Sequence, residues 1–147
     1  MKIKLVLIFL FMVCFSIIEL SAQDFSTVNI YYVKKLGKLD ESITFNKTII
    51  TTMSLGSRLQ CKIYSEGRIN IISNNNLNGQ DNLYIDVEKN KTYYIEMTYK
   101  GYGNAFTGKL RQVEEEEGKK MFESNTKWQL KEFEEDVNDP IIVKKIQ

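Results

Sequence analysis

Histidine is absent from all 147 residues of the chain. Its absence excludes Ser/His/Asp and Cys/His triads, histidine general bases and zinc sites with imidazole ligands. Catalysis by carboxylates alone is the chemistry that this composition leaves open.

Cysteine is scarce, since the chain carries only Cys14 and Cys61. Cys14 belongs to an N-terminal segment that we expect to be removed, which leaves Cys61 alone and without a disulfide partner in the chain. A lone cysteine in an exported protein can be a reactive thiol or a dimer bridge. Cys61, however, alternates with Leu59 and Ile63 on one side of a predicted strand, where cysteine behaves as a small hydrophobe. We therefore expect a buried, unreactive thiol.

Long apolar runs are also missing, because the longest one covers only residues 5–18. This run is shorter than the stretch of about 20 that a membrane-spanning helix needs. Two lysines precede the run and small residues ending at Ala22 follow it, which is the pattern of a secretory signal peptide. Cys14 follows Val13, whereas a lipoprotein signal has a small residue before its cysteine. We expect a signal peptide over residues 1–22, no lipid, no retained membrane span and an exported protein, periplasmic or extracellular.

Neither sign of charge dominates the chain, which has 20 basic and 19 acidic residues. Removal of residues 1–22 takes away two lysines and one glutamate, so that the two signs balance in the mature chain. A nucleic-acid-binding domain usually carries a basic surplus, so we expect no nucleic-acid partner. The remaining segment, 23–147, has the size of one domain with a substantial core.

Alternation of apolar and polar residues extends from Thr27 to Val113 and marks seven predicted strands. In chain order they are TVNIYYV, TIITTM, RLQCKIY, RINIIS, NLYIDVE, NKTYYIEMTY and AFTGKLRQV. Gly67 suits a tight hairpin at residues 65–67, and Asn90 tolerates the left-handed conformation that the turn at 89–91 needs. About seven short strands with tight turns predict a mainly β protein, an antiparallel β-sandwich over residues 23–123.

Helical character is predicted only after the strands. The segment EEEEGKKMFES places acids ahead of lysines, as a helix dipole favours, although Gly118 weakens the helix. The acids at 114–117 are explained by a solvated helix start, with a cation or basic partner as the alternative. We also predict a helix over residues 124–137, within a C-terminal segment 124–147, that packs Trp128, Leu130 and Phe133 against the sandwich. Residues 141–147 are either an added edge strand or a frayed tail.

Tyrosines are predicted on the outer side of the strands, where large rings are unexpected. They are Tyr31, Tyr64, Tyr84 and Tyr94. One hypothesis is that the C-terminal helical segment covers them, which makes Tyr94 structural. The other is that they form an exposed interaction surface that stacks on sugars or packs against a partner protein.

Catalytic and metal sites are not supported by the remaining polar residues. Asp86, Glu88 and Glu96 are predicted to point outward, but no pattern places two of them at a cleft, so a carboxylate-dependent hydrolase is the less favoured hypothesis. The segment NNNLNGQDN resembles a calcium loop only in spacing, because its first ligand is an amide and Ile85 stands where a glutamate is needed. We therefore expect no enzyme activity, no cofactor and no metal.

Three motifs together resemble a known family. They are S-x-G, then L-x-I-x-V-x-x-x-K-x-Y-Y, then V-x-x-E-E-G-K-K, carried by Ser65, Gly67, Leu83, Ile85, Val87, Lys91, Tyr93, Tyr94, Glu117, Gly118 and Lys119. Residues 27–122 resemble a family of bacterial exported and lipoprotein β-sandwich domains of unknown function, similar in style to PEGA-type surface domains. The resemblance implies a sandwich fold and an envelope location, and it supplies no catalytic residues. We expect a cell-envelope module with an interaction or structural role, whose partner is an envelope protein or glycan.

Overall fold

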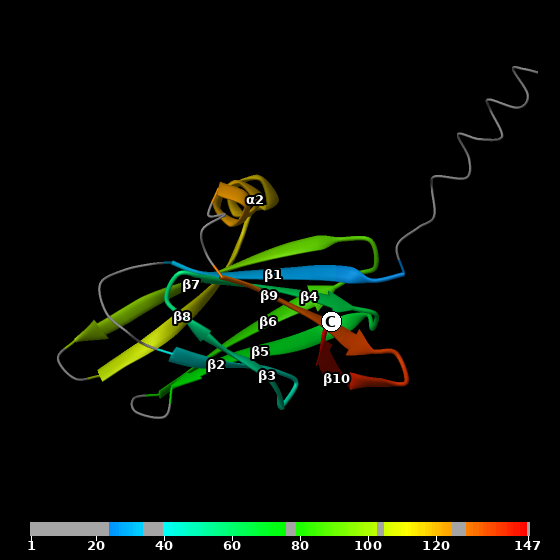
Figure 1. Ribbon diagram of the computed structural model, residues 1–147, viewed down its shortest axis with the longest axis horizontal. Coiled ribbons are helices and arrows are strands. Elements are labelled where there is room, and N and C mark those ends of the chain that lie inside the picture. The colour runs from blue at the N-terminus through cyan, green and yellow to red at the C-terminus, as the bar shows by residue number, and fades with distance from the viewer. Residues whose placement is uncertain (1–23, 34–39, 76–78, 103–104, 125–128, 147) are drawn as a thin grey trace, which may run out of the picture.

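A computed structural model describes residues 24–33, 40–75, 79–102, 105–124 and 129–146. The predicted signal peptide and Trp128 lie outside these residues. The described residues form a β-sandwich, and one helix lies on the outer face of one sheet (Figure 1). No helix in these ranges has the length and apolar character needed to cross a membrane.

The described residues contain ten strands and one helix. In chain order they are β1 Ser26–Tyr32, β2 Asp40–Phe45, β3 Thr48–Ser54, β4 Ser57–Ile63, β5 Gly67–Asn75, β6 Gly79–Val87, β7 Thr92–Tyr102, β8 Ala105–Val113, α2 Glu115–Ser124, β9 Gln129–Asp136 and β10 Asp139–Lys145. Sheet A has the order β10-β9-β4-β1-β7-β8, and sheet B has the order β3-β2-β5-β6. The predicted mainly β sandwich is thus confirmed.

Sheet A is mixed, whereas the sequence predicted an antiparallel sandwich. Strand β1 pairs in parallel with β7, and β4 pairs in parallel with β9. These pairs join strands far apart in the sequence, and the chain crosses repeatedly between the two sheets. The pattern of apolar residues is the same for parallel and antiparallel neighbours, so the sequence does not reveal this feature.

Strand β2 lies in a segment for which the sequence predicted no element. Its inward positions are Glu41, Ile43 and Phe45, and all three side chains are buried. The Glu41 carboxylate accepts a hydrogen bond of 3.0 Å from the hydroxyl of Ser73, which satisfies part of its polar requirement inside the sandwich. An acid at an inward position interrupts the apolar alternation that marks a strand.

The core lies between the sheets and comes mainly from the inward residues that the alternation predicted. Its buried members are Val28, Ile30, Tyr32, Ile43, Phe45, Ile50, Met53, Leu59, Cys61, Ile63, Ile69, Ile71, Ile85, Val87, Ile95, Met97, Leu110 and Phe133. Cys61 is fully buried, as predicted, and burial raises the pKa of its thiol well above the usual value.

The two turns singled out in the sequence have the predicted backbone conformation, but one connects different elements. Gly67 has φ 111° and Asn90 has φ 64°. The predicted hairpin at residues 65–67 is wrong, because β4 belongs to sheet A and β5 belongs to sheet B. The SEG turn therefore carries the chain from one sheet to the other.

The predicted helix over residues 124–137 is wrong, because residues 129–136 form β9. Phe133 points into the core, and Leu130 lies on the outer face with 40% of its surface exposed. Strand β10 then lies along the edge of β9, which agrees with the added edge strand that was one of the two alternatives. Leu, Lys and Glu favour helices in isolation, but the free edge of β4 supplies backbone hydrogen bonds that override this preference.

Candidate interaction surfaces

Helix α2 covers the part of sheet A where two of the four tyrosines lie. Tyr31 and Tyr94 are buried in a second apolar cluster with Val113 and Phe122. The rings of Tyr94 and Phe122 pack edge to face with centroids 6.2 Å apart. Tyr94 is therefore covered by a helix, as expected, but by residues 115–124 rather than by residues 124–137.

Gly118 is the residue that lets the helix approach the sheet. A Cβ atom at this position would lie 2.5 Å from Tyr94 Cγ, closer still to Tyr94 Cβ, and 2.9 Å from Val113 Cγ2. The sequence analysis treated this glycine as a weak point in the helix. In the fold it is the contact point between helix and sheet, since a side chain there would collide with the strand below.

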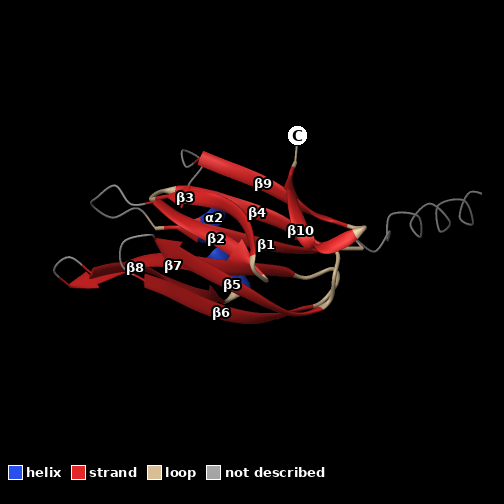
Figure 2. Cartoon of the chain, turned by 90° about the horizontal axis from the view of Figure 1, so that it is seen from below, coloured by secondary structure: helices blue, strands red, loops and turns tan. Residues whose placement is uncertain are grey.

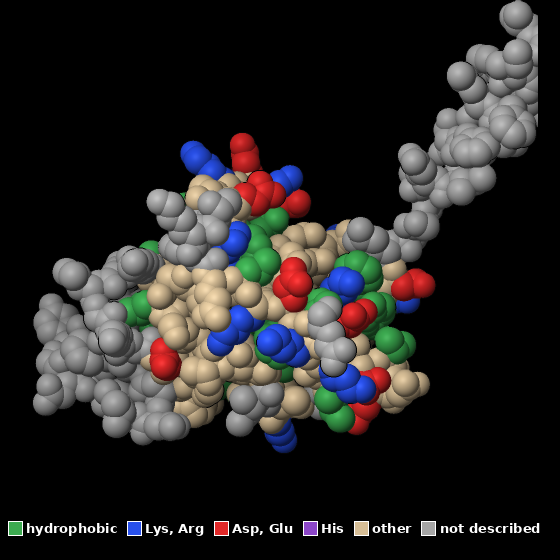
Figure 3. Space-filling view, in the orientation of Figure 1, with side chains coloured by type: hydrophobic (Ala, Val, Ile, Leu, Met, Phe, Trp, Pro, Cys, Tyr) green, Lys and Arg blue, Asp and Glu red, His purple; other side chains and the backbone are tan. Residues whose placement is uncertain are grey.

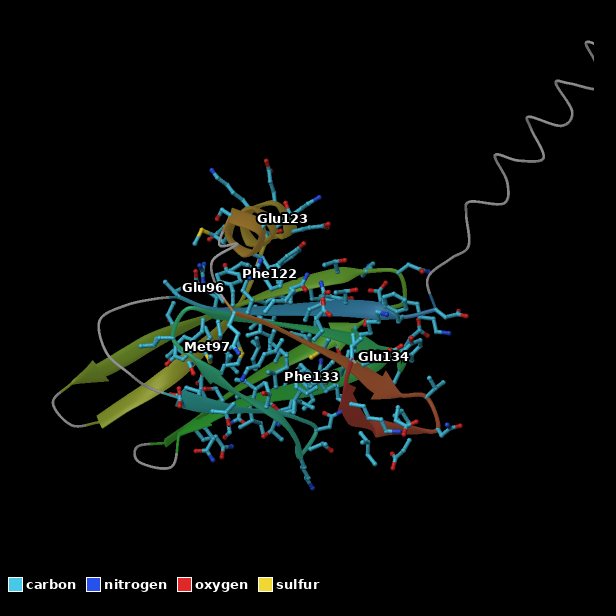
Figure 4. The ribbon with its side chains drawn as sticks, in the orientation of Figure 1. Glu96, Met97, Phe122, Glu123, Phe133 and Glu134 are labelled. Carbon is cyan, nitrogen blue, oxygen red and sulfur yellow. The ribbon has the colours of Figure 1, made fainter. Side chains whose placement is uncertain are left out.

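Arg58 on β4 contacts the C-terminal end of α2 in two ways. Its guanidinium donates a 2.7 Å hydrogen bond to the carbonyl oxygen of Phe122 and lies 5.1 Å from the centroid of the Phe122 ring. Figure 4 shows Phe122 between the helix and sheet A, while Phe133 lies between the sheets. The last turn of α2 contains no basic residue, so the strand supplies the positive charge that a helix C-terminus favours.

A charged row crosses sheet A next to this contact. Tyr31 is the register partner of Arg58 on one side and of Glu96 on the other, and Glu96 pairs with Arg111. Arg111 bridges Glu96 at 3.0 Å and Glu117 of the helix at 3.3 Å. Burial, followed by the negative charges of Glu96 and Glu117, raises the pKa of Tyr31 to about 12. The part of this row at Tyr31 and Glu96 is thus shielded from solvent, whereas the Arg111 side chain remains 58% exposed at the edge of the helix.

Tyr64 is half-buried and belongs to the anchor of the C-terminal hairpin. Its hydroxyl donates to Glu134, and this bond raises the Tyr64 pKa. The neighbouring carboxylate of Glu135 is buried and accepts hydrogen bonds from the backbone N–H of Tyr64 and from both the backbone N–H and the hydroxyl of Ser65. These bonds hold β9 against the SEG turn.

The three outward carboxylates that could have served a hydrolase each have a basic partner. Arg68 binds both oxygens of Asp86 at 3.0 Å and lowers the pKa of that carboxyl. Glu88 lies 2.7 Å from Lys91, and Glu96 is bound by Arg111 as described above. No group of three potential metal-ligating side chains occurs in the described ranges.

An open groove of about 430 Å³ lies where β9 and β10 approach the edge strand β3 of the other sheet. It is lined by Thr51, Gln129, Leu130, Lys131, Glu132, Phe133, Lys145 and Ile146. The Lys131 ammonium group donates to the Thr52 carbonyl oxygen, on the edge strand. Lys131 of β9 thus occupies a backbone acceptor on the edge strand β3.

Sheet B presents the other outer face of the sandwich, and no described element covers it (Figure 2). Its outward side chains, which we call the polar platform, are Asp40, Ser42, Thr44, Thr52, Ser54, Arg68, Asn70, Ile72, Asn74, Gln80, Asn82, Tyr84 and Asp86. Tyr84 is 61% exposed. Of the four tyrosines that the sequence placed on outer faces, Tyr84 is therefore the one that lies open to solvent.

Register places the platform residues in rows across the strands. One row is Thr52, Ser42, Asn74 and Gln80, the next contains Thr44, Ile72 and Asn82, and the third pairs Asn70 with Tyr84. The sequence analysis did not single out the amides in these rows. The signal was present in NLYIDVE, because Tyr84 alternates with Asn82 and Asp86, but sequence alone does not show which outer face stays uncovered.

Comparison of the chain with protein-family models, curated proteins and solved structures finds no match. The resemblance to exported β-sandwich domains therefore stays a prediction. On the face seen in Figure 3, basic and acidic side chains are interspersed instead of gathered into a patch of one sign.

Proposed function

We propose that the protein is an exported, non-catalytic interaction module of the cell envelope and that it binds its partner through the polar platform. The observation that carries this proposal is the contrast between the two outer faces. Helix α2 covers Tyr31 and Tyr94 on sheet A, whereas Tyr84 on sheet B has no cover among the described residues. An exposed aromatic ring on an uncovered sheet is typical of an interaction surface.

Export is supported by the N-terminal sequence. Lysines, an apolar run over residues 5–18 and small residues ending at Ala22 form a secretory signal pattern. The non-catalytic role is supported by the surroundings of Asp86, Glu88 and Glu96. Each lies in an ion pair with a basic side chain, namely Arg68, Lys91 and Arg111 respectively.

The proposal is tested by site-specific photocrosslinking in the organism that encodes the chain. A benzophenone amino acid replaces Tyr84, and the matched control carries the same group at Glu123, an exposed position of α2. We expect the recovered protein to begin at Gln23 by mass spectrometry and to form a heavier product from position 84 only. Equal products from both positions, no product from position 84, or a retained segment 1–22 would contradict the proposal.

A further inference from the structure

The polar platform carries the chemistry of a carbohydrate-binding surface. We infer that it binds a neutral polysaccharide, with the Tyr84 ring stacked on a sugar ring and the neighbouring amides bonded to sugar hydroxyl groups. This inference rests on the proposed function, because it names the partner of the same surface.

The platform carries hydrogen-bond donors and acceptors that match sugar hydroxyl groups. Asn74, Gln80 and Asn82 carry side-chain amides, which have both donors and an acceptor, and the Asn70 amide adds donors, because its Oδ1 is buried. Gln80 Nε2 donates a 3.1 Å hydrogen bond to Asn82 Oδ1, which leaves the second Gln80 N–H, the Gln80 Oε1 and the Asn82 NH2 for a ligand. On the two adjoining strands, Thr44 and Thr52 carry hydroxyl groups, and the Ser42 hydroxyl, which donates to the Asn74 carbonyl oxygen at 2.9 Å, can still accept. Sugar hydroxyl groups also donate and accept, so a surface of amides and hydroxyls can satisfy them in either direction.

The platform has no surplus of basic charge. Arg68 and Asp86 lie at one end of the platform, and two hydrogen bonds of 3.0 Å join them to each other, so the pair adds no net charge. Asp40, at the start of β2, is the remaining charged member, and it is acidic. A phosphate-rich or otherwise anionic polymer requires a basic surplus, which this face lacks.

The platform has few large apolar side chains. Ile72 and Tyr84 are the large apolar side chains among the platform residues, and they occupy adjacent rows of β5 and β6 in which Asn82 and Asn70 are their partners. The centre of a protein–protein interface is usually richer in apolar side chains than this. Tyr84 has the amide of Asn70 opposite it and that of Asn82 beside it. An exposed ring next to amides fits a sugar ring, which has an apolar C–H face and a polar rim.

The width of sheet B also suits a polysaccharide chain. Neighbouring strands lie about 4.8 Å apart, so the four strands of sheet B span roughly 14 Å from centre to centre. This width accommodates a few consecutive sugar rings laid across the strands. Tyr84 on the edge strand β6 would stack at one end of a chain that runs diagonally over the rows, and Thr52 on the opposite edge strand β3 would lie near the other end.

Affinity electrophoresis of the mature chain, residues 23–147, tests the inference. The gels contain dextran, mannan, laminarin, hydroxyethyl cellulose or the neutral polysaccharide fraction from the envelope of the encoding organism, and alginate serves as the anionic comparison. We expect retardation by at least one neutral polymer that persists at high salt. Tyr84→Ala should weaken binding by about tenfold or more, and Tyr84→Phe should retain it because the ring remains.

Two further variants separate binding from folding. Asn82→Ala removes an amide beside Tyr84 and should also weaken retardation, whereas Leu130→Ala, an exposed apolar position on sheet A, should leave it unchanged. Unaltered thermal unfolding of each variant confirms that the fold is intact. The inference is overturned if no neutral polymer retards the chain, if Tyr84→Ala binds like the parent, or if alginate alone binds. If position 84 crosslinks to a partner protein and no polysaccharide retards the chain, the glycan inference is wrong and the proposed function stands. If position 84 gives no crosslinked product and no polysaccharide binds, both the inference and the proposed function are wrong.

Discussion

Replacement of Gly118 by alanine is the most direct test of how the sandwich is covered. On helix propensity alone, alanine should stabilise the protein by about 1 kcal/mol relative to glycine. The contact with sheet A acts in the opposite direction, because the new Cβ would lie 2.5 Å from Tyr94 Cγ and 2.9 Å from Val113 Cγ2. An ordinary carbon–carbon contact needs about 3.5 Å or more, so helix or strand must move by roughly 1 Å.

The magnitude follows from these opposing contributions. Overpacking of a well-packed contact costs about 1–3 kcal/mol, and the upper end applies here because the strand atoms are close to the backbone and cannot rotate away. Subtracting the gain in helix propensity leaves a net destabilisation of about 2 kcal/mol. For a domain of this size the melting temperature should fall by roughly 8 °C. Movement of the helix also weakens the packing of Phe122 against Arg58 and Tyr94.

Urea unfolding of residues 23–147, followed by circular dichroism, measures this difference. The matched controls are Lys119→Ala and Lys119→Gly, because Lys119 is the exposed neighbour of Gly118 on the same helix. At position 119 alanine should be more stable than glycine by about 1 kcal/mol. At position 118 the order should be reversed. If Gly118→Ala is as stable as the parent or more stable, α2 does not pack against Tyr94 in the way described.

Three further predictions concern buried groups. Glu135→Ala should destabilise the protein by about 2 kcal/mol in urea unfolding, because it leaves the N–H groups of the SEG turn without their acceptor. The control Glu132→Ala, at an exposed position, should change stability by less than about 0.5 kcal/mol. Equal effects of the two substitutions would show that Glu135 does not hold β9 against the turn. The pKa of Tyr31 is raised from 10.0 to about 12, so the folded protein retains a proton that the unfolded chain loses. Its contribution to the free energy of unfolding is present below pH 10 and is lost as pH rises toward 12. Tyr31→Phe should therefore make the free energy of unfolding less dependent on pH in this window. Parallel pH profiles for the variant and the parent would contradict this prediction. The Cys61 thiol of the native mature chain should resist a thiol reagent that labels the unfolded chain at once, and rapid native labelling or a disulfide-linked dimer would show that it is not buried.

Local pattern in the sequence determined most strands and their orientation. Val28 and Ile30 on β1, and Ile95 and Met97 on β7, alternate with polar or aromatic residues, and all four are buried between the sheets. This prediction succeeds because successive side chains of a strand point to opposite faces, whichever strand lies beside it. The predicted positive φ angle of Gly67 also depends only on local stereochemistry.

Tertiary structure alone decided what each strand pairs with and which outer face is covered. Residues 129–136 carry helix-forming side chains, and charged residues interrupt their alternation, so local propensity favoured a helix. They form a strand because they pair with the free edge of β4 and because Glu135 accepts hydrogen bonds from the SEG turn. The outward direction of Tyr94 and Tyr84 was readable from their strands, but their different burial was not. Tyr94 is covered because Gly118, well beyond it in the sequence, allows a helix to lie against it, while sheet B has no such helix among the described residues. Contacts between residues distant in sequence leave no periodic trace in either segment, and for that reason only the fold showed that Tyr84, of the four candidate tyrosines, lies on an uncovered face.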